Sequence, residues 1–230
     1  MHQVLGQIKN GLIVSCQALE GEPLHSSFIM GRMALAAKEG GAVGIRANSV
    51  SDIREIKKQV DLPVIGIIKQ VYNDHPVFIT PTLKEIDAIA DTGAEIIATD
   101  ATNRIRPDGK SLEVFYQEVR SKYPHILLMA DVSSVEEAIF ADKLGFDIVA
   151  PTLYGYTEET KGLKIDDHEY AVIKQIVKEV SHAKVLAEGN VSTPEIARSV
   201  LNFNVHSVVV GGAITRPQII TKRFVDALQK

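Results

Sequence analysis

The chain has 230 residues, 45% of them hydrophobic and 23% charged, which excludes an intrinsically disordered protein. The net charge of -4 argues against a nucleic-acid partner, and no apolar stretch is long enough to cross a membrane. The single cysteine, Cys16, excludes an internal disulfide, and residues 1–10 lack the apolar core of a signal peptide. We therefore expect a cytoplasmic protein whose residues 1–230 form one domain.

Eight short apolar runs rich in valine and isoleucine are separated by amphipathic stretches of helix length. The expected strands, in chain order, are residues 12–16, 42–46, 64–69, 95–100, 126–131, 148–153, 184–189 and 207–212. Parallel strands covered by helices on both faces have this continuous apolar character. The pattern predicts an α/β fold, the (β/α)8 TIM barrel. A doubly wound open sheet is the alternative, and the eight units without a reversal disfavour it.

Residues 1–10 precede the first expected strand and carry a small apolar set, Val4, Leu5 and Ile8. We expect this extension to cover the bottom of the barrel. The opposite end is the functional one, because active sites of these barrels lie where the carboxyl ends of the strands meet. The expected strands finish at Gln17, Arg46, Lys69, Asp100, Asp131, Thr152, Glu188 and Gly211-Gly212. These residues should form one site.

Glycine turns follow the last two strands. Gly189 and Asn190 follow the seventh strand, and Gly211 and Gly212 follow the eighth, with Arg216 shortly after. Barrels of this class often bind phosphate between these two loops, because glycines let backbone N–H groups approach an anion. An arginine adds a permanently charged, forked donor. These five residues are the predicted phosphate site; the alternative is that the glycines only form tight turns.

Lys69 and Glu188 end the third and seventh strands, which lie half a turn apart in a ring of eight. The two side chains should therefore face each other across the mouth of the barrel. Acid–base groups on opposite sides of a carbon next to a carbonyl can invert its configuration, which is the chemistry of an epimerase. Desolvation and Arg46 would lower the lysine pKa from its usual value of about 10.4, and Glu188 would oppose them. The alternative is a ring of ion pairs that caps the core.

Four other strand-end residues are candidates for holding a small-molecule substrate. Arg46 and Asp131 are predicted to position and polarise it, and Gln17 to bind a hydroxyl or amide. Thr152 belongs to the same group. Asp100 is ambiguous and could orient its neighbours. Cys16 fits a buried, unreactive thiol better than a nucleophile.

Several motifs of cofactor-dependent enzymes are absent from the sequence. No histidine ends an expected strand, and none has the spacing H-x-H or H-E-x-x-H. Neither G-x-G-x-x-G after the first strand nor a phosphate-binding P-loop motif occurs. We therefore predict chemistry without a metal or a nucleotide cofactor. The long stretches 70–82 and 154–166 follow strands and are either lids over the substrate or ordinary surface loops.

The chain resembles the bacterial N-acetylmannosamine-6-phosphate 2-epimerases from about residue 11 to residue 224. The resemblance rests on the segments GLIVSCQALEGEPLHSS, GAVGIRAN, LPVIGIIK, FITPT, DATNRIRP, LMADVSS, TLYGYT, AEGNVSTPEI and GGAITRPQIITKRF. It implies a (β/α)8 barrel that interconverts N-acetylmannosamine 6-phosphate and N-acetylglucosamine 6-phosphate in sialic acid breakdown, without metal or nucleotide. Thr99, in place of leucine, and Ala150-Pro151, in place of small hydroxyl residues, depart from the family pattern.

The resemblance also implies roles for individual residues. The family's essential lysine and glutamate match Lys69 in GIIK and Glu188 in AEGN, and its substrate-orienting arginine matches Arg46 in GIRAN. Its aspartate matches Asp131 in MADVSS, and its first-strand glutamine matches Gln17. Its phosphate loops match Gly189-Asn190 and Gly211-Gly212 with Arg216.

The sequence also fits two other functions. In a Schiff-base lyase Lys69 would be the amine nucleophile. A barrel that only binds a phosphorylated ligand would need no opposed ionisable groups. Barrels of this size often pair as homodimers, although no surface in the sequence requires one.

Overall fold

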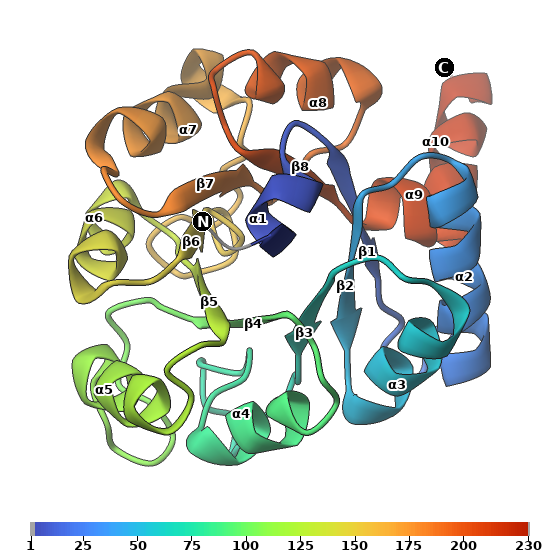
Figure 1. Cartoon of the computed structure of the whole chain (residues 1–230). Coiled ribbons are helices and arrows are strands. Elements are labelled where there is room, and N and C mark those ends of the chain that lie inside the picture. The colour runs from blue at the N-terminus through green and yellow to red at the C-terminus, as the bar shows by residue number, and fades with distance from the viewer. Residues whose placement is uncertain (1–2, 230) are drawn as a thin grey trace.

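The structure, a computed structural model, describes residues 3–229 and is a closed barrel of parallel strands surrounded by helices (Figure 1). The strands are β1 Leu12–Cys16, β2 Gly44–Asn48, β3 Val64–Ile67, β4 Ile96–Asp100, β5 Leu127–Asp131, β6 Ile148–Ala150, β7 Lys184–Ala187 and β8 Ser207–Val210. Each strand pairs with the next one in the chain, and β8 pairs with β1. The predicted (β/α)8 barrel is confirmed, and the open sheet is excluded.

The helices alternate with the strands and cover the outside of the barrel (Figure 1). They are α1 Gln3–Ile8, α2 Ser27–Glu39, α3 Val50–Gln59, α4 Leu83–Ala90, α5 Leu112–Lys122, α6 Val135–Leu144, α7 Asp167–Glu179, α8 Pro194–Leu201, α9 Gly212–Thr215 and α10 Pro217–Leu228. Local sequence sets their starts: Thr193 accepts a hydrogen bond from the Ile196 N–H, and Pro194 takes the first position of α8. In residues 3–229 no helix is long and apolar enough to cross a membrane.

Alternation along the strands divides the core in two. In β1, Ile13 points into the barrel, whereas Val14 points out toward the helices. The interior cluster takes one or two such residues from every strand except β2, and Leu5 and Ile8 of α1 belong to it. Figure 1 shows α1 across one end of the barrel. That end lies at the strand starts, because the Ser207 hydroxyl at the start of β8 bonds the Ile8 carbonyl oxygen.

Several predicted strands have the wrong ends, and the differences matter for the site. The third, sixth, seventh and eighth strands stop at residues 67, 150, 187 and 210, two or three residues before their expected ends. Lys69, Thr152 and Glu188 therefore lie past the paired ladder. The second strand was placed two residues early: Gly44 pairs with Ile13, which puts Arg46 in the middle of β2 opposite Ser15. With Ile45 facing the helices, alternation turns Arg46 into the barrel.

Candidate active site

A cavity of about 560 Å3 opens at the carboxyl ends of the strands. Ten of the eleven predicted site residues line it: Gln17, Arg46, Lys69, Thr152, Glu188, Gly189, Asn190, Gly211, Gly212 and Arg216. Because β3 and β7 are four places apart in the ring of eight, Lys69 and Glu188 enter the cavity from opposite walls. The structure thus brings the predicted acid–base pair and the predicted phosphate loops to one space.

The eleventh residue, Asp131, lies behind the cavity wall. It is fully buried, and its two carboxylate oxygens accept hydrogen bonds from the two terminal nitrogens of Arg46 at 3.0 and 2.6 Å. The hydroxyl of Thr152 donates to the same carboxylate at 2.7 Å. Asp131 is therefore placed to act on the cavity through Arg46 and Thr152.

Arg46 also binds the carboxylate of Glu188, with 2.8 Å between Nη1 and Oε2. Burial disfavours the charged guanidinium, yet the attraction of Asp131 and Glu188 outweighs it and raises the Arg46 pKa. For Glu188 the largest effect is burial, which raises its pKa, and repulsion by Asp131 adds to it against the attraction of Arg46. One arginine is shared by two buried carboxylates, so its attraction does not offset the burial of Glu188. Glu188 is thus a carboxyl group that can hold a proton near neutral pH.

Lys69 is half-buried just past β3 and has a different environment. Its backbone N–H donates to the Asn48 side-chain oxygen at 2.8 Å, and it forms an isolated antiparallel bridge with Ile79. No residue in the described range 3–229 makes a hydrogen bond or ion pair with its amine. Desolvation, followed by repulsion from Arg46 and Arg216, lowers the pKa of Lys69 to about 8. A substantial neutral fraction of this amine exists at mildly alkaline pH, as a general base requires.

The phosphate end has the backbone geometry that glycine allows. Gly189 has φ +107°, and a Cβ there would lie 2.7 Å from the Pro151 carbonyl oxygen, so only glycine fits. The side chain of Arg216 reaches this end but is held by Glu22, with Nε–Oε1 and Nη2–Oε2 distances of 2.6 and 3.0 Å. A phosphate would therefore have to share Arg216 with a carboxylate.

A model of the family described as "Putative N-acetylmannosamine-6-phosphate epimerase" matches residues 30–230. A relative in Listeria welshimeri, named putative N-acetylmannosamine-6-phosphate 2-epimerase, is 55% identical over 100% of this chain and 97% of its own length. A relative of the same name in Shouchella clausii is 57% identical, with 100% of both chains covered. The chain belongs to this epimerase family.

Solved structures agree with the assignment. The N-acetylmannosamine-6-phosphate 2-epimerase of Clostridium perfringens is 51% identical and superposes with a TM-score of 0.92, covering 98% of this chain and 96% of that one. A thiamine phosphate pyrophosphorylase from Pyrococcus furiosus, 20% identical, has a TM-score of 0.61 over 93% of this chain and 90% of its own. The second similarity shows only that the barrel is shared.

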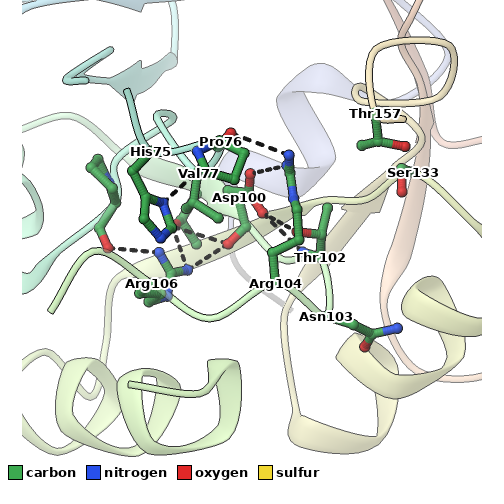
Figure 2. Close-up of polar contacts among 12 residues, drawn as sticks. His75, Pro76, Val77, Asp100, Thr102, Asn103, Arg104, Arg106, Ser133 and Thr157 are labelled. Carbon is green, nitrogen blue, oxygen red and sulfur yellow. Dashed lines mark hydrogen bonds and ion pairs between the residues drawn. The ribbon is translucent and has the colours of Figure 1, made fainter. Parts of the chain in front are cut away.

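Two features of this member of the epimerase family were predicted less well. Asp100 is buried away from the cavity, and its carboxylate accepts hydrogen bonds from Thr102 and Arg104 (Figure 2). The alternative of an ion-pair ring is partly correct, since Arg46, Asp131 and Glu188 are paired. The unpaired amine of Lys69 does not fit such a ring.

Sequence reasoning did not assign twelve other lining residues to the site, among them Ser15, Ser192 and Arg223. Phe78 and Tyr156, which also line the cavity, lie in the two long stretches considered as lids. Ser15 accepts a hydrogen bond from Gln17 at 2.8 Å, and the alternation of β1 was the signal that could have found it. Arg223 resembles any surface charge of an amphipathic helix, so only the three-dimensional structure reveals it. Within residues 3–229 no group of three or more potential metal-binding side chains is present.

Proposed function

We propose that this protein interconverts N-acetylmannosamine 6-phosphate and N-acetylglucosamine 6-phosphate by moving a proton at C2. The observation that carries the proposal is the pair of ionisable groups on opposite walls of one cavity, an unpaired amine of lowered pKa and a carboxyl group of raised pKa. The two sugars differ only in configuration at C2, so a proton acceptor and a proton donor on opposite sides suffice for the reaction.

The proposed reaction begins with the 6-phosphate held by the loops after β7 and β8 and with opening of the sugar ring. The C1 aldehyde that results acidifies the C2 proton. Lys69 takes this proton, the C2–H electron pair forms a C1–C2 double bond, and the C1 oxygen becomes an enolate. A proton returned to the opposite face of C2 closes the cycle. The acetamido group stays in place throughout.

Arg46 is suited to stabilise the negative charge of the enolate. Its guanidinium is fixed by two carboxylates before the substrate arrives, so no reorganisation is needed as negative charge develops. Glu188 is proposed to donate its proton either to the ring oxygen during opening or to the face of C2 opposite Lys69. Glu188→Gln separates these roles. If Glu188 serves the opposite face of C2, exchange of the C2 proton with solvent should continue without inversion; if Glu188 opens the ring, exchange and inversion should be lost together.

Reaction in heavy water tests the enolate route. Product formed from either sugar should carry deuterium at C2, detected by NMR or mass spectrometry. Product without deuterium would eliminate the proposed mechanism. The Schiff-base alternative is tested in parallel with borohydride, which should leave the protein unlabelled in the presence of substrate. Covalent labelling of Lys69 would favour the lyase.

We expect a bell-shaped dependence of kcat on pH. In both reaction directions the working state holds one proton shared by Lys69 and Glu188, so activity falls when the pair gains a second proton at low pH or loses its only proton at high pH. The midpoints belong to the pair and lie near the lowered Lys69 pKa of about 8 and the raised Glu188 pKa.

Glu188→Gln provides the check on this assignment. The substitution leaves Lys69 as the one titrating member of the pair, so the remaining activity should rise once, as Lys69 loses its proton, and then stay level at alkaline pH. An alkaline fall that persists in Glu188→Gln would contradict the assignment of that limb to the pair.

Arg216→Gln is expected to raise the KM for the sugar phosphate roughly 10- to 100-fold with little change in kcat, because a charge-assisted bond to phosphate is made equally in substrate and transition state. Steady-state kinetics measures the effect. Glu22→Gln is the matched variant: it frees Arg216 from its carboxylate and should lower KM. A reduced kcat at unchanged KM in Arg216→Gln would assign this arginine to the chemical step.

We propose further that residues 1–230 act as one cytoplasmic domain that pairs as a homodimer. The only cysteine is a buried free thiol, which suits a reducing compartment. The exposed apolar side chains of α10, among them Phe224 and Leu228 at 70% and 87% exposure, support an interface. Light scattering after gel filtration tests the dimer.

A further inference from the structure

Arg106, in the loop after β4, is a buried arginine that pairs with no carboxylate among residues 3–229. Only 2% of it is exposed, and its guanidinium carbon lies 3.6 Å from the centre of the Phe115 ring. Its hydrogen bonds go to neutral oxygens: the Pro81 carbonyl at 2.9 Å, the Thr99 hydroxyl at 3.0 Å and the Asp100 carbonyl. Its Nε has no partner among the described residues. Burying a charge without a counter-charge costs free energy, so the contacts that Arg106 makes are expected to have a structural or functional role.

The oxygens that Arg106 binds belong to a junction between β4 and residues 77–81. The Thr99 hydroxyl has a single proton; because it accepts from Arg106, it is oriented to donate to the Thr80 carbonyl at 2.9 Å. The Asp100 N–H donates to the Ile79 carbonyl at 2.9 Å. Together with the bond from Arg106 to Pro81, these contacts fix residues 79–81 against the end of β4.

A second arginine fixes the preceding turn (Figure 2). Arg104 binds the Asp100 carboxylate at 2.7 Å and the Thr102 hydroxyl at 2.9 Å, and it donates to the Pro76 carbonyl at 3.2 Å. We call Thr99, Asp100, Arg104 and Arg106 the β4 clamp. Figure 2 shows both guanidinium groups around Asp100, with His75, Pro76 and Val77 beside them.

The other edge of residues 77–81 pairs with the residues around Lys69. The Thr80 N–H donates to the Ile68 carbonyl at 2.7 Å, and the Ile68 N–H donates to the Thr80 hydroxyl at 3.2 Å. The Gln70 N–H donates to the Phe78 carbonyl at 2.9 Å. Lys69 lies between these bonds, opposite Ile79. Residues 77–81 thus connect the β4 clamp to the backbone that carries the amine.

Thr80 at the centre of this connection is strained. It is fully buried and has φ +47°, a left-handed conformation that a β-branched residue rarely adopts. Such strain is unfavourable and persists only where surrounding contacts enforce it. The carbonyl of Thr80 is held by Thr99, and its N–H is held by Ile68. Loss of the clamp would therefore let Thr80 relax and would move the backbone next to Lys69.

We propose that Arg106 is a positioning residue for Lys69. It acts through Thr99 and residues 77–81, which keep the amine pointing into the cavity and keep the cavity wall beside it closed. Phe78 and Ile79 belong to that wall, so the same contacts keep water from the amine. The role of Lys69 in this inference rests on the proposed function. The placement of its side chain does not, and it can be measured without turnover.

Arg106→Lys tests the proposal because it keeps the charge and removes the forked donor. We expect kcat to fall roughly 10- to 100-fold with KM nearly unchanged, as for a small misplacement of a reacting group. Titration of lysines labelled with 13C at Cε, with Lys69 assigned by its loss in Lys69→Arg, gives the second readout. The Lys69 pKa should rise from about 8 toward its usual value, because water enters through the loosened wall.

A direct charge effect would not explain that rise. The charged groups that face Lys69 are unchanged in Arg106→Lys; they are Glu22, Arg46, Asp131, Glu188 and Arg216. Arg120→Lys is the matched control. Arg120 also lies over an aromatic ring, that of Tyr116, and donates to a backbone carbonyl, that of Ile126 at 2.8 Å, but at the opposite end of the barrel. This variant should leave kcat and the Lys69 titration unchanged.

Thr99→Val removes the link between Arg106 and Thr80 and serves if Arg106→Lys does not fold. It should lower kcat and raise the Lys69 pKa, as Arg106→Lys does, but by smaller amounts. A Lys69 titration that matches the wild type in every clamp variant that folds would overturn the proposal, as would an equal shift in Arg120→Lys. If the wild type shows no epimerase turnover, the proposed function is refuted. If the Lys69 pKa nevertheless rises in Arg106→Lys, the positioning role is supported.

Discussion

Lys69→Ala is expected to lower kcat about 10²–10⁴-fold, the usual contribution of a general acid–base group, and to leave KM for the sugar phosphate nearly unchanged. The amine makes no bond to another residue in the described chain, so its removal disturbs little besides the chemistry. Steady-state kinetics in both directions measures the effect. Exchange of the C2 proton with solvent, followed by NMR, should slow to the same extent, because the amine is proposed to break that bond.

Lys84→Ala is the control for Lys69→Ala. Lys84 is exposed at the start of α4, just beyond residues 77–81, and its replacement should leave kcat as in the wild type. Turnover by Lys69→Ala close to that of the wild type would remove Lys69 from its proposed role. A lost exchange reaction combined with normal epimerisation would also contradict the enolate route.

The barrel and the opposed placement of Lys69 and Glu188 could be predicted because they depend on chain order. Eight apolar runs with helices between them specify parallel strands, and in a closed ring the third and seventh strand ends must face each other. Lys69 and Glu188 therefore fall on opposite walls whatever the details of the loops. The strand ends themselves were less predictable. In β3, β6, β7 and β8 the ladder of hydrogen bonds stops two or three residues before the expected end, and the sequence carries no signal of where pairing stops.

The features that the sequence did not predict depend on contacts between residues distant in the sequence. Arg46 was predicted at a strand end. The pairing of Gly44 with Ile13 instead places it inside the barrel, where it forms ion pairs with Asp131 and Glu188. Arg106 is one of two arginines in a polar loop and has no local signal of burial. Its surroundings arise only when residues 77–81 turn back against β4, and the left-handed Thr80 that permits this turn has no signature in the sequence.

Arg46→Met is expected to lower the free energy of unfolding by about 3–5 kcal/mol, the cost of leaving buried charge without its partner. The substitution keeps much of the side-chain volume but leaves Asp131 with only Thr152 and Glu188 with no cation at bonding distance. Urea denaturation measures the loss. Arg120→Met is the control, because the pair of Arg120 and Asp147 is about one-quarter exposed and its loss should cost much less.

The stability loss in Arg46→Met should depend on pH in a defined direction. Attraction by Arg46 lowers the Glu188 pKa, so without the arginine this pKa rises further above its value in the unfolded chain. A carboxyl group whose pKa is raised by folding binds more protons in the native state, and its contribution to stability then grows as pH falls through the raised pKa. The difference between variant and wild type should therefore be larger at pH 8 than at pH 5.5. An equal difference at the two pH values would mean that Glu188 does not depend on Arg46 for its charge, and the preformed enolate site would lose its basis.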